Sequence, residues 1–313
     1  MPTDAQNPGK QPGMNAVSNR SLLTKLSTQT RAVRNLLLYS SVYLAVIAMA
    51  EVVLVTELLG LPLTPAPIVA GLLTFAVYGN DRLADLETDA KTAPARTAFV
   101  RRYQDGFYVL AAIAYGLAVA LSVLGGPLSF GLSLLPGAFW VLYACDWMPS
   151  LPGGTQRLKD IFLLNSTLVA VAWALVIVFL PLTYVGAPVS PTVGVVFLFF
   201  VLATFVNTEI PNVRDKEGDS EIGVRTLPVV VGVRRTKYIL YGITGLTAAL
   251  LGVACLADLI SLRAVTVLVA SLFSLSGVIF CLDNVENDGA LAVAAECTRL
   301  PAFVVVGFPL LGL

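Results

Sequence analysis

Carboxylates gather in two short segments of this 313-residue chain, and their spacing suits the binding of a divalent cation. In the first segment, Asp81 comes directly after Asn80, and Asp81, Asp85 and Asp89 are spaced four residues apart. Such intervals place three carboxylates on one face of a helix, where like charges repel one another. Local stability therefore does not explain the arrangement. A shared Mg²⁺ ion does, because Mg²⁺ takes oxygen ligands from carboxylates and from substrate phosphates.

The second segment, residues 212–219, has a similar pattern. Asn212, Asp215 and Asp219 are three and four residues apart, so a helix presents them on one face. Solvated loops that are acidic by chance are the alternative interpretation. Two regularly spaced clusters in a chain with only 20 acidic residues favour a metal site instead. We expect the two segments to enclose a metal-bound diphosphate from opposite sides.

The elements that must position these carboxylates are membrane-spanning helices. Apolar residues make up 57% of the chain and charged residues 13%, with a mean hydropathy of +0.81. Soluble domains average roughly 45–50% apolar residues and about 25% charged residues. Apolar stretches of about 20 residues, the length that crosses a bilayer, recur from Asn35 onward. They are continuous rather than alternating, which favours helices over a β-barrel. The predicted fold is all-α, a polytopic membrane protein with about nine transmembrane helices over residues 35–59, 61–79, 105–124, 127–146, 161–182, 190–208, 236–257, 261–282 and 290–312.

Basic residues give these helices an orientation. All of the 20 Lys and Arg residues except Arg263 and Arg299 fall in the N-terminal segment or in alternate loops, which the positive-inside rule assigns to the cytoplasm. Residues 1–34 are polar and rich in Pro, Gly, Asn and Gln, and are predicted to be a disordered cytoplasmic tail before a transmembrane domain of residues 35–313. Both carboxylate segments follow even-numbered spans, so both are predicted at the cytoplasmic face of the cell membrane.

The remaining composition excludes several kinds of chemistry. The chain has no histidine, which excludes histidine-based catalysis and the usual catalytic zinc sites. Its four cysteines are scattered and form no CxxC pair. The basic residues of the tail fit headgroup attraction or topology. Nothing in the sequence indicates a nucleic acid, and no obligate protein partner is implied.

Both carboxylate segments resemble the motifs of the UbiA family of intramembrane prenyltransferases. Residues 80–89 match its NDxxDxxxD motif, and residues 212–232 resemble its DxxDxxxD motif with the trailing GxRTLPVxxG. The resemblance covers the chain after residue 34 and implies helices around a central cavity. It also implies Mg²⁺-dependent transfer of a polyprenyl group from an allylic polyprenyl diphosphate to a hydrophobic acceptor within the bilayer. The acceptor could be an aromatic quinone precursor, an isoprenoid glycerol phosphate or a carotenoid.

This chain departs from the family at two places. Asn212 stands where the family usually has an aspartate, and the Arg-Pro that commonly follows the first motif is missing. The resemblance assigns metal binding to Asp81, Asp85, Asp89, Asp215 and Asp219, of which all but Asp89 are also assigned to catalysis. It assigns substrate binding to Asn80, Arg157, Lys159 and Asn212. Tyr143 and Asn165 are further candidate substrate-binding residues, because both are expected near the cytoplasmic rim of the bundle. Arg157 and Lys159 have an alternative role in orienting the helices, Asn165 in a helix–helix hydrogen bond and Tyr143 in an interfacial aromatic belt.

Residues outside the motifs also have two interpretations. Glu51, inside the first span, is either a functional intramembrane carboxylate or the ion-pair partner of Arg299 in the ninth. Tyr78 either shields an allylic cation with its ring or belongs to the aromatic belt. Two other functions stay open for the whole chain: a cation-coupled membrane transporter, and a catalytically degenerate family member that binds lipid.

Overall fold

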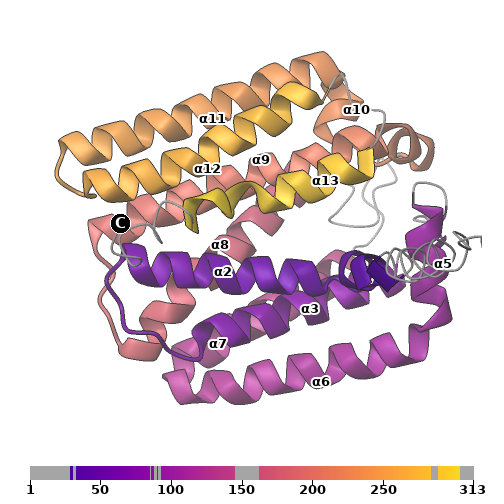
Figure 1. Cartoon of the computed structure of the whole chain (residues 1–313), viewed down its shortest axis with the longest axis horizontal. Coiled ribbons are helices and arrows are strands. Elements are labelled where there is room, and N and C mark those ends of the chain that lie inside the picture. The colour runs from indigo at the N-terminus through magenta and orange to yellow at the C-terminus, as the bar shows by residue number, and fades with distance from the viewer. Residues whose placement is uncertain are drawn as a thin grey trace, which may run out of the picture.

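A computed structural model describes residues 29–30, 33–84, 86–87, 90, 93–144, 162–282 and 288–303. Every regular element within these residues is a helix (Figure 1). The α-helices are α2 (Val42–Leu58), α3 (Ala66–Ala84), α5 (Pro94–Arg102), α6 (Gln104–Ser122), α7 (Gly126–Ala144), α8 (Leu164–Val185), α9 (Pro191–Ile222), α10 (Leu227–Val231), α11 (Val233–Leu256), α12 (Leu262–Cys281) and α13 (Asp288–Glu296). Two short 3₁₀ helices, η1 (Val123–Gly125) and η3 (Cys297–Arg299), continue α6 and α13.

The described part of the chain contains five apolar segments long enough to cross a bilayer, which are Gln104–Val141, Leu164–Val185, Pro191–Glu221, Val233–Leu256 and Leu262–Cys281. A sixth arises if Val33–Tyr39 and α2, which meet at a 68° bend, form one span. The prediction of about nine spans is therefore not confirmed. The last turns of α3 hold polar motif residues, and the last expected span is described only as far as residue 303.

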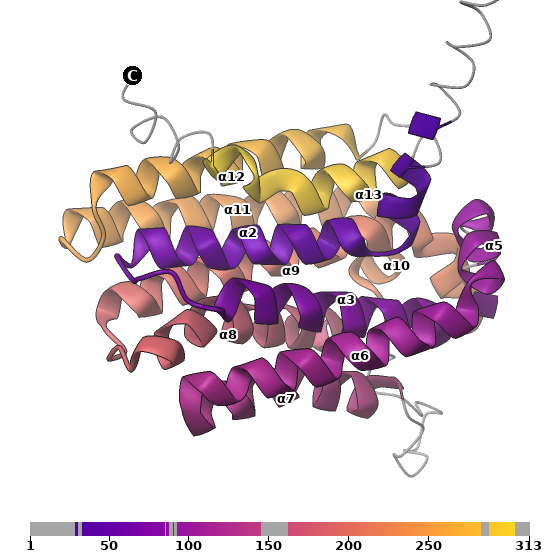
Figure 2. The ribbon, with the colours of Figure 1, turned by 60° about the horizontal axis from the view of Figure 1, so that its bottom comes forward.

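The 38-residue segment Gln104–Val141 folds back on itself. A straight helix of that length would extend about 57 Å at 1.5 Å per residue, almost twice the roughly 30 Å hydrocarbon core. Gly126 instead adopts a φ of 85°, which an L side chain rarely tolerates, and α6 and α7 pack side by side (Figure 2). This hairpin agrees with the two separate ranges predicted from the sequence.

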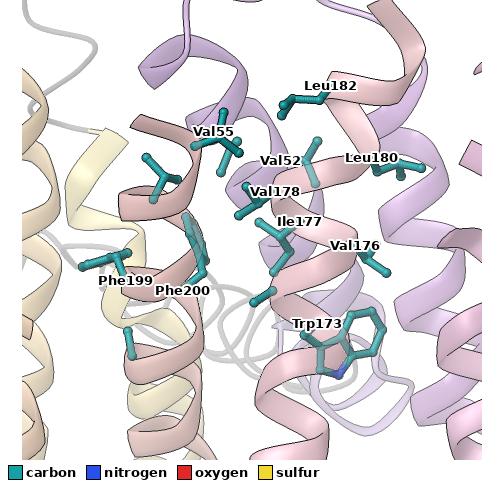
Figure 3. Packing of buried hydrophobic residues seen from close by; sticks show 14 of the residues in the cluster. Val52, Val55, Trp173, Val176, Ile177, Val178, Leu180, Leu182, Phe199 and Phe200 are labelled. Carbon is teal, nitrogen blue, oxygen red and sulfur yellow. The ribbon is translucent and has the colours of Figure 1, made fainter. Parts of the chain in front are cut away.

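The helices form layers around a continuous apolar core. In Figure 1, α11 and α12 lie along one edge of the bundle and α6 along the opposite edge, with α8 and α9 between them. The core joins α2, α3, α8 and α9, and Val52, Ile177, Phe199 and Phe200 are among its buried side chains (Figure 3). Burial of these apolar groups is the main stabilising contribution inside the bundle.

Large apolar side chains also cover outward-facing surfaces. Leu110, Ile113 and Leu117 on α6 are each more than half exposed, and Phe273 on α12 is 82% exposed. Soluble proteins rarely expose contiguous apolar surface of this kind. The outward faces of α6 and α12 are therefore suited to lipid, and the chain is a multi-pass membrane protein.

Candidate active site

The first motif begins within the last turns of α3. This helix ends at the same side of the bundle as α9, where α5 and α10 also lie (Figures 1 and 2). We call this side the motif end, and it contains Asp81, Asp215 and Asp219. Asp85 and Asp89 lie outside the described residues. The expectation that the first motif starts on a helix is met for Asn80 and Asp81.

Asp81 lines a pocket of about 120 Å³ between α3, α7 and α8. Among the described residues that line the pocket, it is the one carboxylate, and the others are apolar or aromatic. The lining residues are Val77, Tyr78, Asp81, Pro136, Phe139, Trp140, Leu168, Val169, Ala172 and Trp173. We call this space the Asp81 pocket. It places one carboxylate beside apolar and aromatic walls.

Two aromatic rings form one side of the Asp81 pocket. The rings of Tyr78 and Trp173 are stacked, with centroids 5.9 Å apart and planes inclined by 10°. Aromatic faces carry partial negative charge and attract cations. Trp140 lies on the same pocket, and its indole Nε1 is buried with no hydrogen-bond partner among the described groups. Of these residues, sequence reasoning identified only Tyr78, because a lone tryptophan in an apolar helix is typical of core packing.

Asn80 opens onto a different space from its neighbour Asp81. Its side-chain amide donates a 2.9 Å hydrogen bond to the carbonyl of Ala76, one turn back along α3. It lines a larger, apolar groove of about 550 Å³ between α3, α6 and α7, which also contacts Tyr115 and Gly137. Successive residues of a helix point about 100° apart, which is why the adjacent motif residues reach different spaces.

Arg82 fixes the position of the end of α3. The side chain is buried, and its guanidinium donates hydrogen bonds of 3.1 Å and 2.6 Å to the carbonyls of Leu38 and Tyr39. These carbonyls lie at the C-terminal end of the helix Val33–Tyr39, where backbone acceptors lack intrahelical partners. Arg82 therefore caps one helix from another, a contact that holds the motif end of α3 in place.

The second motif lies on the last turns of α9, which continues without interruption through Pro211 to Ile222. The amide of Asn212 donates a 3.2 Å hydrogen bond to Oε2 of Glu209, whose side chain is buried. Gly223 then ends the helix with a φ of 80°, as is common at a helix C-terminus. The expected helical arrangement of Asn212, Asp215 and Asp219 is thus present.

Both aspartates of the second motif have polar partners within the protein. The guanidinium of Arg214 donates to both carboxylate oxygens of Asp215, at 2.8 Å and 2.5 Å. The hydroxyl of Thr226, in the turn before α10, donates to Oδ2 of Asp219 at 3.3 Å. Neither aspartate lines the Asp81 pocket.

The oxygen donors at the motif end fit a hard divalent cation, since Mg²⁺ prefers carboxylate and carbonyl oxygens. Across the described ranges, however, no three acidic, cysteine or histidine side chains are gathered closely enough to form a metal site. Asp85 and Asp89 fall outside those ranges. The proposed set of five carboxylates therefore stays a prediction.

The other expected substrate-binding residues are distributed as follows. Arg157 and Lys159 lie outside the described residues. Tyr143 belongs to α7, but its side chain is not among those described. Asn165 is half-buried in the first turn of α8. Their substrate contacts stay predictions.

Glu51 and Arg299 form a buried ion pair between α2 and η3, as one of the two interpretations of Glu51 predicted. The second guanidinium nitrogen of Arg299 donates a 2.7 Å hydrogen bond to the hydroxyl of Thr204 in α9. Next to it, Thr298 donates to the side-chain oxygen of Asn207 at 3.4 Å. Polar contacts thus tie η3 to α2 and α9 in the middle of the bundle.

The all-helical architecture and the polar groups at the ends of α3 and α9 define a class of integral membrane proteins with a carboxylate-bearing site at one end of the bundle. The sequence model of the UbiA prenyltransferase family matches residues 37–295. The chain therefore belongs to the UbiA prenyltransferase family.

Solved structures with the same fold agree with this assignment. An apo UbiA homologue from Aeropyrum pernix K1 is 15% identical, with a TM-score of 0.62 over 85% of this chain and 97% of its own. A UbiA homologue from Archaeoglobus fulgidus bound to GPP and Mg²⁺ is also 15% identical, with a TM-score of 0.60 over 87% of this chain and 99% of its own. A digeranylgeranylglyceryl phosphate synthase is 15% identical, with a TM-score of 0.56 over 88% of this chain and 95% of its own. Among curated proteins, no sequence matches this chain.

Proposed function

We propose that this protein transfers a polyprenyl group from an allylic polyprenyl diphosphate to a hydrophobic acceptor in the membrane, with Mg²⁺ as its cofactor. The observation that carries the proposal is the Asp81 pocket, where one carboxylate meets apolar and aromatic walls at the motif end. Membership of the UbiA prenyltransferase family supports the same reaction. So do the Archaeoglobus fulgidus homologues, which were solved with GPP or DMAPP and Mg²⁺.

The residues that would hold the metal are Asp81, Asp85, Asp89, Asp215 and Asp219. When bound, Mg²⁺ neutralises the negative charge that develops on a departing diphosphate. Asn80, Arg157, Lys159, Asn212, Tyr143 and Asn165 are the proposed substrate contacts. Arg214, which already binds a carboxylate through two nitrogens, has the geometry that suits a phosphate as well.

The walls of the Asp81 pocket serve the other half of the reaction. Loss of diphosphate leaves an allylic carbocation, which water would quench. Val77, Leu168 and Phe139 exclude water, and the stacked rings of Tyr78 and Trp173 offer π-faces to the positive charge. In this arrangement the diphosphate of the substrate binds near Asp81 through the metal, and the adjoining prenyl group lies against the apolar and aromatic walls.

The proposal includes an orientation. With the N-terminal segment and both motifs in the cytoplasm, the diphosphate enters from the aqueous side on which it is soluble. The basic residues around the second motif, Arg214, Lys216 and Arg225, support this orientation.

Release of diphosphate tests the reaction class directly. Purified protein in lipid is incubated with geranylgeranyl diphosphate and an acceptor extract, and free diphosphate is measured with Mg²⁺ and with a chelator. We expect release with Mg²⁺ and none with the chelator. Uptake of a cation into vesicles without any loss of diphosphate would instead identify a transporter. Binding of the diphosphate without release would identify a degenerate, lipid-binding family member.

A further inference from the structure

A buried carboxylate lies one helical turn before the second motif, and neither motif includes it. Glu209 of α9 is 1% exposed, although it is only three residues from Asn212. Burial of a carboxylate is costly unless its oxygens are hydrogen-bonded. Three donors among the described residues offset this cost for Glu209, and they come from three different helices. The position of this side chain is therefore fixed by its surroundings.

The three donors are the hydroxyl of Ser166 in α8, the amide of Asn212 in α9 and the backbone N–H of Leu227 in α10. The contact with Asn212 measures 3.2 Å between Nδ2 and Oε2 of Glu209. All three donors are uncharged and direct a hydrogen at the same side chain. A carboxylate satisfies them because it only accepts, whereas a glutamine would turn its own NH₂ group toward at least one of them.

The contact with Glu209 determines which end of the Asn212 amide is free. A carboxylate accepts hydrogen bonds, so the amide atom beside Oε2 is the nitrogen and not the oxygen. The oxygen lies on the other side of the planar amide and points away from Glu209. Because Asn212 shares a helix face with Asp215 and Asp219, this oxygen can join their carboxylates as a ligand of one cation.

The charge of Glu209 favours the same role for Asn212. An asparagine near a metal-bound diphosphate has two possible roles: its oxygen coordinates the metal, or its NH₂ group donates to a phosphate oxygen. A carboxylate 3.2 Å from the amide nitrogen repels a phosphate that approaches that nitrogen, and it attracts a cation. Water screens this interaction little, because Glu209 is buried. Coordination of the metal is therefore the favoured role.

Glu209 also fixes the segment that reaches Asp219. Leu227 is the first residue of α10, and its backbone N–H donates to Glu209. Thr226, directly before it, donates a 3.3 Å hydrogen bond to Oδ2 of Asp219. Two adjacent residues of this turn thus bind two carboxylates of α9. Glu209 acts on Asn212 directly and on Asp219 through the turn.

We propose that Glu209 is a positioning residue of the second motif, which holds the Asn212 amide with its oxygen toward the metal and steadies Asp219 through the turn before α10. This inference rests on the proposed function. It also accounts for the asparagine at position 212, since an aspartate there would lie beside a buried carboxylate and be repelled by it. An amide gives hydrogen to Glu209 and oxygen to a metal at the same time, which an ionised carboxylate cannot do.

The test compares the full-length parent in lipid with Glu209→Gln, Asn212→Asp and the double variant that combines them. The probe is geranylgeranyl thiolodiphosphate, in which sulfur replaces the oxygen at C1 so that ionisation is slow. The measured quantity is the Mg²⁺ concentration that half-saturates equilibrium binding of this probe. Glu209→Gln should raise that concentration by about 10–100-fold, the usual effect of losing a group that orients a metal ligand. Asn212→Asp should lower it only slightly, because repulsion from Glu209 opposes the added charge.

The double variant gives the sharpest result. Its new amide donates to its new carboxylate, so its half-saturating Mg²⁺ concentration should fall below that of Asn212→Asp. The effect of Glu209→Gln therefore reverses its sign between the two backgrounds, which a purely structural role does not produce. Because the double variant restores a donor and an acceptor at these positions, it tests the inference even when Glu209→Gln alone is too unstable to purify.

Two control variants separate positioning from folding. Ser166→Ala removes a different donor from the same carboxylate and should lower the thermal unfolding temperature without changing the half-saturating Mg²⁺ concentration. Glu57→Gln alters an exposed carboxylate of α2 and should change neither quantity. A parental Mg²⁺ requirement in Glu209→Gln, or a higher requirement in the double variant than in Asn212→Asp, would overturn the inference and leave the proposed function intact. A parent without Mg²⁺-dependent binding of the probe would overturn the proposed function, and this inference with it.

Discussion

The polar contacts of the second motif join residues that are close together in the sequence, whereas the buried Glu51–Arg299 ion pair joins helices that are far apart in the sequence. Arg214 binds the adjacent Asp215, and Thr226 reaches Asp219 from seven residues away. In the interior, Arg299 binds Glu51 across 248 residues. The second-motif contacts lie within α9 and the turn that follows it, and the side chains of Arg214 and Asp215 are partly accessible. The interior ion pair joins helices and is almost fully buried.

This difference indicates different roles for carboxylates of one protein. A partly exposed carboxylate with a local partner can exchange that partner for a metal ion without disturbing the bundle. A buried ion pair cannot be opened cheaply, because removal of one partner leaves an uncompensated charge in an apolar environment. We therefore expect substitutions at the motif end to reduce turnover and those of the Glu51–Arg299 pair to reduce stability.

The largest expected effect comes from the first motif. Asp81→Asn and Asp85→Asn each keep the side-chain shape but ligate Mg²⁺ poorly, so turnover should fall by several orders of magnitude. The thermal unfolding temperature in detergent should stay at the parental value. Near-normal prenyl transfer by either folded variant would remove the first motif from the metal site.

The second largest effect is expected from breaking the Glu51–Arg299 ion pair, and it is an effect on stability. Glu51→Ala leaves the Arg299 guanidinium buried without its carboxylate, which should cost about 3–5 kcal/mol of unfolding free energy. Equilibrium unfolding in detergent measures this loss. The double variant Glu51→Leu with Arg299→Met removes both charges and should recover most of the stability. Equal unfolding free energies for the parent and Glu51→Ala would show that the pair has no structural role.

Asn212 should have a smaller effect than the aspartates that follow it. We expect Asp215→Ala and Asp219→Ala to lose most activity at limiting Mg²⁺, while Asn212→Ala loses only several-fold. Asn212→Asp adds a charge at the proposed metal, which should tighten the apparent affinity for Mg²⁺. It also replaces the hydrogen bond to buried Glu209 with a repulsion between two carboxylates, which limits the gain. A Mg²⁺ titration of activity for the four variants measures these differences. Full activity of both aspartate variants at limiting Mg²⁺ would exclude the second motif as a metal site.

Cysteine substitutions near the two ends of α9 should leave activity unchanged and differ only in the side of the membrane from which they are labelled. Ser220 is exposed in the last turn of α9, and Pro188 is exposed just before the helix begins; α9 has 32 residues and is about 48 Å long at 1.5 Å per residue. An impermeant thiol reagent should reach Ser220→Cys only from the cytoplasmic side and Pro188→Cys only from the outside. The parent, with its native cysteines, is the control. Labelling of both positions from one side would contradict the proposed orientation.

Much of the fold is predictable from the sequence, because long apolar runs in a membrane protein specify helices. The ranges expected for α6, α7, α8, α11 and α12 agree with the structure to within a few residues. The range expected for α9 ended at residue 208, whereas the helix continues to Ile222. Apolar length marks only the part of a helix inside lipid, and charged residues with good helix propensity extend it beyond.

Other features depend on tertiary contacts that a single sequence does not contain. The bend before α2 occurs at Ser41, which has a φ of 66° and no strong helix-breaking neighbour. The metal motifs are recognisable because their carboxylates share a helix face. Trp173 was missed because it is a single aromatic residue in an apolar segment, and only the packing of α8 against α3 and α7 brings it to the Asp81 pocket.

The central claim is that this chain forms a covalent bond between a prenyl group and a lipid acceptor. The most direct measurement is mass spectrometry of the products after membranes containing the protein are incubated with geranylgeranyl diphosphate, Mg²⁺ and a panel of acceptors. We predict a product heavier than one acceptor by a single geranylgeranyl group, formed by the parent and Glu57→Gln and lost in Asp81→Asn. Intact acceptors and intact diphosphate in the parental reaction, at the same level as in membranes without the protein, would contradict the account.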